Sequence, residues 1–308
     1  MLSTQVRPRI AVITDDPGWH GKRLREALTA RHCDTAFLSL CECRLDLDDD
    51  GLPVRLPGFE NRLPEAVFVR GVPGGTLEQV VFYLDILHTL RLLGIPVYND
   101  GHAIERTVDK GMTSFLLRQA GVPTPPTWVV NDSATARARA EREIAAGHSL
   151  VTKPLFGSQG KGLRRLARGD AIPEAAEYAG VWYLQRFLPS APGQWRDWRV
   201  LVAGGAAVAA MVRRGRSWIN NVARGARCEP CEPDPAMSRL ALDAARALGM
   251  DYAGVDIMRD ARGALTVIEV NSIPAWKGLQ GVTGFDIAQR LVDDFVQRRL
   301  RPRLEAAG

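Results

Sequence analysis

The sequence predicts a mixed α/β and α+β chain, in which an open and mostly parallel sheet comes first and antiparallel sheets follow. Over residues 1–100, short apolar strands alternate with helical stretches, which is typical of a parallel sheet with crossover helices. From residue 150 onward strands outnumber helices and short turns join them, which indicates antiparallel pairing. The composition is that of an ordinary globular protein, because 46% of the 308 residues are hydrophobic and 24% are charged.

The elements of the first part follow from the spacing of apolar residues. We expect strands at 9–16, 35–40, 66–71 and 95–100, and helices at 19–31 and 76–93. The first turn lacks G-x-G-x-x-G, so a Rossmann dinucleotide site is not supported. Arg70 ends one of these strands. It should therefore lie at the carboxyl edge of the sheet, where ligands usually bind.

The elements of the second part are assigned in the same way. A helical stretch over 103–122 is broken by the proline-rich sequence that follows it. We then expect helices at 133–146, 236–248 and 284–299, and strands at 180–188, 197–204, 206–214, 253–260 and 265–271.

Charge, hydropathy and cysteine content argue against several classes of protein. The net charge is only +5 and the basic residues are spread out, so we expect no nucleic-acid partner. No apolar run approaches the roughly 18 residues that a membrane span needs. The N-terminal stretch has the features of a first strand rather than of a signal peptide, which favours a cytoplasmic location. The five cysteines are therefore expected to be reduced thiols rather than disulfides or zinc ligands.

A glycine-rich stretch, LVTKPLFGSQGKG, occupies residues 150–162. It is not a P-loop, which requires G-x-x-x-x-G-K-[ST], because Leu155 stands at the first glycine position and Gly162 at the final hydroxyl position. Lys153 ends a strand just before the turn, and Lys110 lies near a helix start. Lysine ammonium groups bind phosphate oxygens, although single lysines are more often solvated surface residues.

Two apolar strands near residue 260 are interrupted by acids. Asp256 lies within the first strand, and Glu269 and Asn271 share one face of the second. The sequence RDARGAL between them is a plausible hairpin turn, and pairing would bring Asp256 to the same face. Two carboxylates and an amide oxygen suit Mg²⁺. The alternative is a strand with a polar, solvent-facing side, which the burial cost of acids in apolar runs disfavours.

Arginines cluster in MVRRGRSWINNVARGA, residues 211–226, which contains Arg213, Arg214, Arg216 and Arg224. Such clusters bind carboxylate or phosphate groups, but a charged hairpin tip explains the pattern equally well. The sequence contains no G-x-S-x-G motif and no convincing Cys/His pair, so it gives no indication of a covalent nucleophile.

Together and in this order, these stretches resemble the ATP-grasp ligases, in particular the RimK-like branch. The resemblance covers residues 100–300 and rests on RTVDKGMTSFLLRQAGVPTPPT, KPLFGSQGKG, LQRFLPSAPGQWRDWRV, NNVARGA, AGVDIM and VIEVNSIPAWKGLQGVTGFDIA. It implies a pre-ATP-grasp α/β domain over 1–100, a central lobe over 101–188 and a C-terminal lobe over 189–308.

The resemblance also implies roles for residues around ATP. Lys110 and Lys153 are expected at the phosphates, with Lys153 also near the adenine. A mobile loop should close over the phosphates, and it contains Gly157, Ser158, Gln159 and Gly160. The backbone of a hinge should bind the adenine edge, and it comprises Gln185, Arg186, Phe187 and Leu188. Arg186 departs from the family, which often has an acid there; a backbone contact would survive the change.

Further positions are implied around the metal and the substrates. Asp197 matches a position near the nucleotide, and Asp256, Glu269 and Asn271 match the ligands of Mg²⁺ or Mn²⁺. The phosphate and acyl-transfer site would include Asn221 and Arg224, joined by Arg213 or by its neighbour Arg214. Arg70 and Trp276 are expected on the substrate side, with Trp276 stacking on an aromatic acceptor.

The reaction implied is ligation of a carboxylate to an amine through an acyl phosphate, with release of ADP. The stretches RGVPGGTLEQV and NSIPAWKGLQGVTGFDIA resemble those of RimK-like proteins of tetrahydromethanopterin-dependent metabolism in methylotrophs. The expected substrates are therefore glutamate and a small-molecule carboxylate such as a pterin coenzyme, and the expected assembly is a homo-dimer or tetramer. A ligase that modifies a protein or peptide C-terminus remains an alternative, as does a non-catalytic ATP-binding scaffold.

Overall fold

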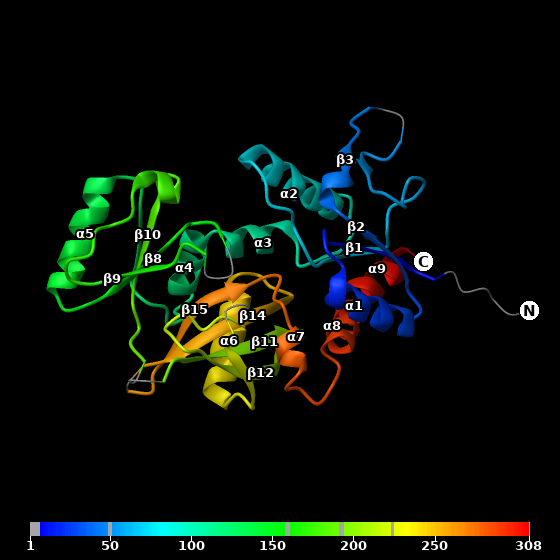
Figure 1. The fold of residues 1–308 in the computed structure, drawn as a ribbon. Helices are drawn as coiled ribbons and strands as arrows, with labels where there is room; N and C mark the ends of the chain where they lie inside the picture. Colours follow the sequence, from blue (N-terminus) through cyan, green and yellow to red (C-terminus); the bar gives the residue numbers. More distant parts are fainter. Residues whose placement is uncertain are drawn as a thin grey trace, which may run out of the picture. The chain divides into compact units, whose positions relative to one another are not determined.

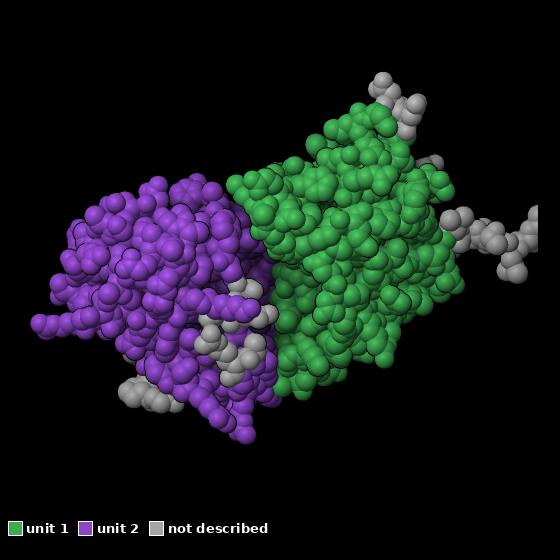
Figure 2. All heavy atoms as spheres, turned by 45° about the horizontal axis from the view of Figure 1, so that its top comes forward, with its two compact units in different colours: residues 1–104, 273–308 green, residues 105–272 purple. Residues whose placement is uncertain are grey.

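Two compact units make up the chain. The computed structural model describes residues 7–48, 51–157, 161–190, 194–222, 225–260 and 262–307. Unit 1 comprises residues 1–104 with 273–308, and unit 2 comprises residues 105–272 (Figure 2). The described residues form one four-stranded parallel sheet, antiparallel sheets of four and five strands, and a two-stranded antiparallel pair, which confirms the predicted fold class. The division into three domains stays a prediction.

Unit 1 is built on a parallel sheet with the strand order β2-β1-β5-β6, of which β1 and β2 are labelled in Figure 1. Its strands are β1 (Arg9–Ile13), β2 (Asp34–Leu38), β5 (Ala66–Val69) and β6 (Val97–Tyr98), joined in part by the helices α1 (Gly18–Ala30) and α2 (Leu77–Leu92). After β2 come the short elements η1 (Leu40–Glu42), β3 (Arg44–Leu45) and β4 (Val54–Arg55). Because β2 and β5 flank β1 on opposite sides, the strand order reverses between β1 and β5. Ligands bind at such a reversal in open α/β sheets.

The C-terminal segment returns to unit 1, where its helix α8 (Ile287–Phe295) packs beside α1, red against blue in Figure 1. The Phe295 ring lies 5.6 Å from the ring of Tyr98, and the Tyr98 hydroxyl donates a hydrogen bond to Asp294 at 2.6 Å. A short helix α7 (Lys277–Gln280) precedes α8, and a π-helical turn (Val296–Leu300) leads to α9 (Arg301–Ala307). The helix predicted over 284–299 is therefore a regular α-helix only from Ile287 to Phe295, and the helical path continues through the π-helical turn into α9.

The helix expected over 103–122 is interrupted. It forms α3 (Gly101–Val108) and α4 (Lys110–Gln119), separated at Asp109. The Asp109 carboxylate accepts hydrogen bonds from the backbone N–H groups of Gly111 and Met112, at 2.8 and 3.0 Å, and so caps α4. The break therefore makes Lys110 the first residue of a helix.

Unit 2 contains two antiparallel sheets. The smaller one has the order β7-β10-β8-β9 and packs against α5 (Ser133–Ala145). Its strands are β7 (Thr127–Val130), β8 (Leu150–Lys153), β9 (Arg164–Leu166) and β10 (Trp182–Arg186), with the 3-10 turn η2 (Ala175–Tyr178) before β10. The larger one has the order β13-β12-β11-β14-β15 and packs against α6 (Pro235–Ala247). Its strands are β11 (Arg196–Ala203), β12 (Ala206–Arg214), β13 (Arg227–Cys231), β14 (Tyr252–Arg259) and β15 (Leu265–Asn271).

In the part of the chain that the structure describes, no helix has both the length and the apolar character needed to cross a bilayer. The cytoplasmic location and the dimer or tetramer stay predictions.

Candidate nucleotide and metal site

The two predicted phosphate lysines lie in unit 2, at the ends of neighbouring elements. Lys153 is the last residue of β8 and stands opposite Tyr183 of β10. Its Nζ lies 4.9 Å from the centre of the Tyr183 ring and donates to Oε1 of Gln185 at 3.4 Å. An aromatic face and an amide oxygen therefore hold this ammonium.

Lys110 is held by backbone carbonyls of the glycine-rich stretch. Its Nζ donates to the carbonyl oxygens of Leu155 and Gly157, at 3.1 and 2.8 Å. Burial lowers the pKa of Lys110 to about 8, with Lys153 contributing, while Glu269 and Asp109 raise it. Lys110, Lys153 and Glu269 therefore share one electrostatic neighbourhood.

The glycine-rich loop is described at its two ends, and the predicted residues Ser158, Gln159 and Gly160 lie outside the described residues. At its end, the Tyr178 hydroxyl donates to the carbonyl oxygen of Gly162 at 2.7 Å. Gly162 has a φ of +70°, and a Cβ there would lie 2.8 Å from Pro154 Cγ. Only glycine suits this position, because both the backbone and the close contact with Pro154 exclude a side chain.

The predicted hinge begins in β10 and continues beyond it. Gln185 is 5% exposed, and its amide donates to the hydroxyls of Tyr183 at 2.8 Å and Thr127 at 3.1 Å. Arg186 donates from Nε to the buried Glu143 of α5 at 2.7 Å. The Arg186 side chain therefore has its own partner in α5, which is a physical reason for an arginine at this hinge position.

Phe187 and Leu188 follow β10 and are half-buried. The guanidinium of Arg165, from β9, lies 4.2 Å from the centre of the Phe187 ring. The ring of Trp218 meets Phe187 edge-on, with centroids 5.9 Å apart. Sequence reasoning missed Arg165 and Trp218, since nothing in the local sequence connects them to the hinge.

A row of charged side chains crosses the larger sheet. Asp197 and Arg199 are two residues apart on β11 and so share one face. Asp197 stands opposite Arg213 of β12, and Arg199 stands opposite Asp256 of β14. The row is nearly all buried, with exposed side-chain fractions of 15% for Arg199 and 6% or less for the others.

Two arginines hold Asp256. Arg199 donates to both of its carboxylate oxygens at 2.7 Å, and Nη2 of Arg213 lies 2.9 Å from Oδ2. Nε of Arg213 also donates to Asp197 at 2.6 Å. Sequence reasoning missed Arg199, although its position two residues after Asp197 placed it on the same face.

The pKa values of the two acids in this row are shifted in opposite directions. Burial alone would raise the pKa of Asp256, but Arg199 and Arg213 outweigh it and hold that pKa below its usual value. Burial raises the pKa of Asp197 to about 6, against the opposing effect of Arg213. The difference follows from the contacts, because Asp256 has hydrogen bonds from two arginines and Asp197 from one.

The predicted metal ligands meet across β14 and β15. These strands pair, with Asp256 opposite Glu269 and Asn271 opposite Gly254, and an irregularity follows Asp256. Glu269 and Asn271 are half-buried, and the Asn271 amide donates to the carbonyl oxygen of Gly254 at 3.4 Å. The donor set of two carboxylates and an amide oxygen fits a hard divalent cation such as Mg²⁺. Their role as ligands stays a prediction.

The predicted acyl-transfer residues are only partly described. Arg213 belongs to the charged row, whereas Arg224 lies outside the described residues. The backbone carbonyl of Asn221 accepts from the N–H of Ala226 at 3.2 Å.

The two predicted substrate residues are found together in unit 1. The guanidinium carbon of Arg70 lies 4.9 Å from the centre of the Trp276 indole, and Nη1 of Arg70 donates to the carbonyl of Ile273 at 3.4 Å. Trp276 is only 1% exposed. Stacking of this ring on an acceptor therefore stays a prediction, because the described residues leave almost none of the indole exposed.

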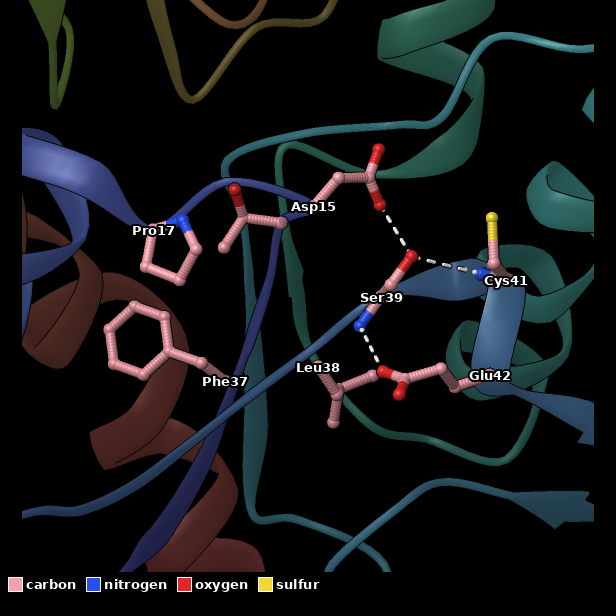
Figure 3. A pocket seen from close by; sticks show the side chains of 8 residues that line it. Asp15, Pro17, Phe37, Leu38, Ser39, Cys41 and Glu42 are labelled. Atoms are coloured by element: carbon pink, nitrogen blue, oxygen red, sulfur yellow. Dashed lines mark hydrogen bonds between the residues drawn. The ribbon is translucent and has the colours of Figure 1, made fainter.

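A separate pocket of about 410 Å³ lies at the carboxyl ends of β1 and β2 in unit 1. Figure 3 shows Ser39 at its centre, with Asp15, Cys41 and Glu42 around it and with Pro17 and Phe37 on the other side. The Ser39 hydroxyl donates to Asp15, and the Ser39 N–H donates to Glu42 at 3.1 Å. The polar part of this pocket is therefore acidic.

Comparison with known proteins gives one consistent result. The family described as the RimK-like ATP-grasp domain matches residues 107–295. The chain is 36% identical over 236 residues to the tetrahydromethanopterin:alpha-L-glutamate ligase of Methanococcus maripaludis, covering 75% of this chain and 78% of the relative. It is 30% identical to a probable alpha-L-glutamate ligase of Teredinibacter turnerae, covering 96% and 97% of the two chains. Among solved structures, the ATP-grasp ligase PsnB with a minimal precursor superposes with a TM-score of 0.73 at 24% identity, covering 95% and 99%.

Proposed function

The chain belongs to the RimK-like ATP-grasp family, and from that premise we propose that it joins L-glutamate to a tetrahydromethanopterin-type acceptor at the cost of ATP. The relatives named tetrahydromethanopterin:alpha-L-glutamate ligase support this choice of substrates. Three of them match this chain at 32–37% identity over 70–75% of its length.

One observation carries the proposal to this chain's own residues. Lys110 and Lys153, expected to bind phosphate, share an electrostatic neighbourhood with Glu269, expected to bind the metal. All three lie in unit 2, inside the span that matches the family. Two cations beside a carboxylate can bind a polyanion together with its divalent counter-ion.

The proposed reaction has two steps. An oxygen of the acceptor carboxylate attacks the γ-phosphorus of ATP, the bond to the β,γ-bridging oxygen breaks, and ADP leaves with that electron pair. The amino group of glutamate then attacks the acyl carbon, the acyl–phosphate bond breaks, and phosphate leaves as the amine loses a proton. Lys110 and Lys153 would hold the phosphate oxygens, because a fixed ammonium stabilises charge that moves from one oxygen to the next.

The residues around the proposed metal have separate tasks. Mg²⁺, when bound, would neutralise phosphate oxygens, and Asp256, Glu269 and Asn271 would hold it. Arg199 is a positioning residue, because its paired contacts at 2.7 Å fix the orientation of the Asp256 carboxylate. Arg213, with Asn221 and Arg224, would face the acyl phosphate.

The test is a substrate screen with the purified chain, ATP, Mg²⁺, L-glutamate and tetrahydromethanopterin. We expect ADP release that depends on both substrates and a product heavier by one glutamyl residue in mass spectrometry. Glu269→Gln should abolish both signals. The matched control is Glu229→Gln, which removes an acid from a surface pair with Arg214 and should leave the rate unchanged.

Other outcomes would redirect the proposal. Glutamyl addition to a peptide or protein, with none on the pterin, would replace the acceptor and keep the ligase. Tight ATP binding without ADP release under any substrate pair would favour a non-catalytic scaffold. Full turnover in Glu269→Gln would contradict the proposed metal site.

A further inference from the structure

Trp276 carries a polar group that the proposed nucleotide site does not explain. The side chain is 1% exposed, and its indole Nε1–H has no acceptor among the described residues. Buried donors without a partner are rare in folded proteins, because the group loses water and gains nothing in return. A water molecule or a ligand group could supply the acceptor that this N–H lacks among the described residues.

The surroundings of this N–H are positively charged. Arg70 lies 4.9 Å from the centre of the indole ring, and Lys277 is the next residue in the chain. The same two side chains act on His20, because burial first, and then Arg70 and Lys277, lower its pKa to about 4, although Asp16 raises it. His20 Nε2 accepts a hydrogen bond from the backbone N–H of Trp276 at 3.2 Å, which requires a neutral imidazole.

The position in the fold is one where ligands bind. Arg70 comes directly after β5, at the carboxyl edge of the parallel sheet. The neighbouring strand β1 ends nearby, since a Cβ at Gly71 would lie 3.3 Å from the Cα of Thr14. This is the reversal point between β1 and β5, at which open α/β sheets bind ligands.

The two halves of this sheet edge differ in charge. On the β2 side, the pocket of Figure 3 presents Asp15 and Glu42, which would repel an anion. On the β5 side, Arg70, Lys277 and the Trp276 indole supply hydrogen-bond donors and two positive charges, and arginine matches the planar shape of a carboxylate. A carboxylate is therefore favoured on the β5 side alone.

We propose that Arg70, Lys277 and the Trp276 indole N–H form a carboxylate-binding subsite for a substrate of this ligase. The assignment rests on the proposed function, because both glutamate and the acceptor of a glutamate ligase carry carboxylates. In this proposal Trp276 donates a hydrogen bond to the substrate, whereas its ring was expected from the sequence to stack on an aromatic acceptor.

Direct binding tests the subsite without turnover. The probe is glutarate, titrated by calorimetry into the full chain without ATP, and glutaramide is the neutral probe of the same length. Wild type should bind glutarate and not glutaramide. Trp276→Phe, which keeps the ring and removes the N–H, and Lys277→Met should each weaken glutarate binding by roughly tenfold, as expected for hydrogen bonds or charges directed at a carboxylate.

A matched control comes from the same neighbourhood. Trp19 meets His20 edge-on at 5.1 Å, but it is not part of the subsite, so Trp19→Phe should leave glutarate affinity unchanged. Lys277 is exposed, so Lys277→Met should fold even if a change at the buried Trp276 does not. Equal affinity in wild type, Trp276→Phe and Lys277→Met, or no saturable glutarate binding to wild type at millimolar concentrations, overturns the subsite.

Steady-state kinetics identify which substrate supplies the carboxylate. If glutamate does, its KM should rise about tenfold in Lys277→Met, with the KM for ATP and for the acceptor unchanged. If the acceptor does, its KM should rise in place of that for glutamate. Glutarate binding that responds to these variants in a chain without glutamate ligase activity would refute the proposed function and support the subsite. Ligase activity with no change in the KM for glutamate or for the acceptor would support the proposed function and refute the subsite.

Discussion

The two halves of the candidate site in unit 2 hold their cations in different ways. Next to the smaller sheet, neutral groups hold the two lysines. The carbonyls of Leu155 and Gly157, which follow β8, hold Lys110 of α4, and an amide oxygen and a ring face hold Lys153 of β8. In the larger sheet, buried carboxylates hold the arginines. Bonds to neutral acceptors are weaker than bonds between opposite charges, so the lysines can exchange their partners for phosphate at small cost.

The arginines of the larger sheet, by contrast, cannot leave their partners without a large loss of free energy. Removing one partner of a buried ion pair leaves an uncompensated charge, so Arg199, Arg213, Asp197 and Asp256 stabilise one another as a set. The comparison suggests a division of tasks, in which the lysine half binds and the carboxylate half keeps the metal ligands in position. Variants can test each half for stability and for binding separately.

The largest effect on stability should come from Arg213→Met. The change leaves Asp197 without its arginine and removes one of two arginines from Asp256, so we expect a loss of roughly 3–5 kcal/mol in the free energy of unfolding by urea. Arg214→Met is the matched control, because Arg214 is the next residue and pairs with Glu229 at the surface. It should cost about 0–1 kcal/mol. Equal losses in the two variants would show that the charged row is not a structural unit.

Lys153→Met should give the converse result. We expect affinity for a non-hydrolysable ATP analogue to fall by roughly 10- to 100-fold, because a charge-assisted phosphate contact is lost. The free energy of unfolding should change by only about 0.5 kcal/mol, since no buried ion pair is broken. Calorimetry and urea unfolding measure the two quantities. Lys161→Met, at an exposed lysine of the same loop, serves as the control. Unchanged affinity for the ATP analogue combined with a large loss of stability would mean that Lys153 stabilises the fold and does not bind phosphate.

The pKa of Lys110, lowered to about 8, gives a pH test of the lysine half. Phosphate binds the charged form, which is present below pH 8 and is lost as the pH rises through 8. Affinity for the ATP analogue should therefore be constant from pH 6.5 to 7.5 and fall above pH 8, approaching tenfold per pH unit. Lys110→Arg stays charged and should remove this decline. A decline of the same size in Lys110→Arg would assign the titration to another group.

The free energy of unfolding should rise, rather than fall, as Lys110 loses its proton. The unfolded chain keeps this proton up to a pKa of about 10.5, so between pH 8 and 10.5 the unfolded state binds more protons than the folded state. The contribution of Lys110 to the free energy of unfolding is therefore least favourable below pH 8 and improves as the pH rises. The difference between wild type and Lys110→Met isolates it.

Local patterns predicted the part of the site that lies within one hairpin. Alternation along one strand placed Glu269 and Asn271 on the same face, and pairing across a short turn brought Asp256 opposite Glu269. The partners of Asp256 come from β11 and β12, and their register depends on packing between distant segments. The burial of Trp276 depends in the same way on His20 and Arg70, which are far away in the chain. The helix break at Asp109 was not predicted, although aspartate is a favoured residue at the start of a helix and caps α4 in the structure.

The smallest effect should come from Tyr183→Phe, which separates the two contacts that Tyr183 makes in the lysine half. Its ring faces Lys153, while its hydroxyl lies 2.8 Å from Ser114 Oγ and accepts from Gln185 at 2.8 Å. Ser114 also donates to the carbonyl of Lys110, so this hydroxyl connects the supports of both lysines. Phenylalanine keeps the ring contact and loses the connection, which should cost about 1 kcal/mol.

We expect the KM for ATP to rise roughly fivefold in Tyr183→Phe, with kcat unchanged, because binding geometry is altered and no group at the reacting atoms is removed. Ser114→Ala should give a similar rise, and the double variant should add little to either, since both changes break one hydrogen-bonded connection. Additive effects would mean that the two residues act separately. A fall in kcat with an unchanged KM would place Tyr183 in the chemical step, and the lysine half would then do more than bind.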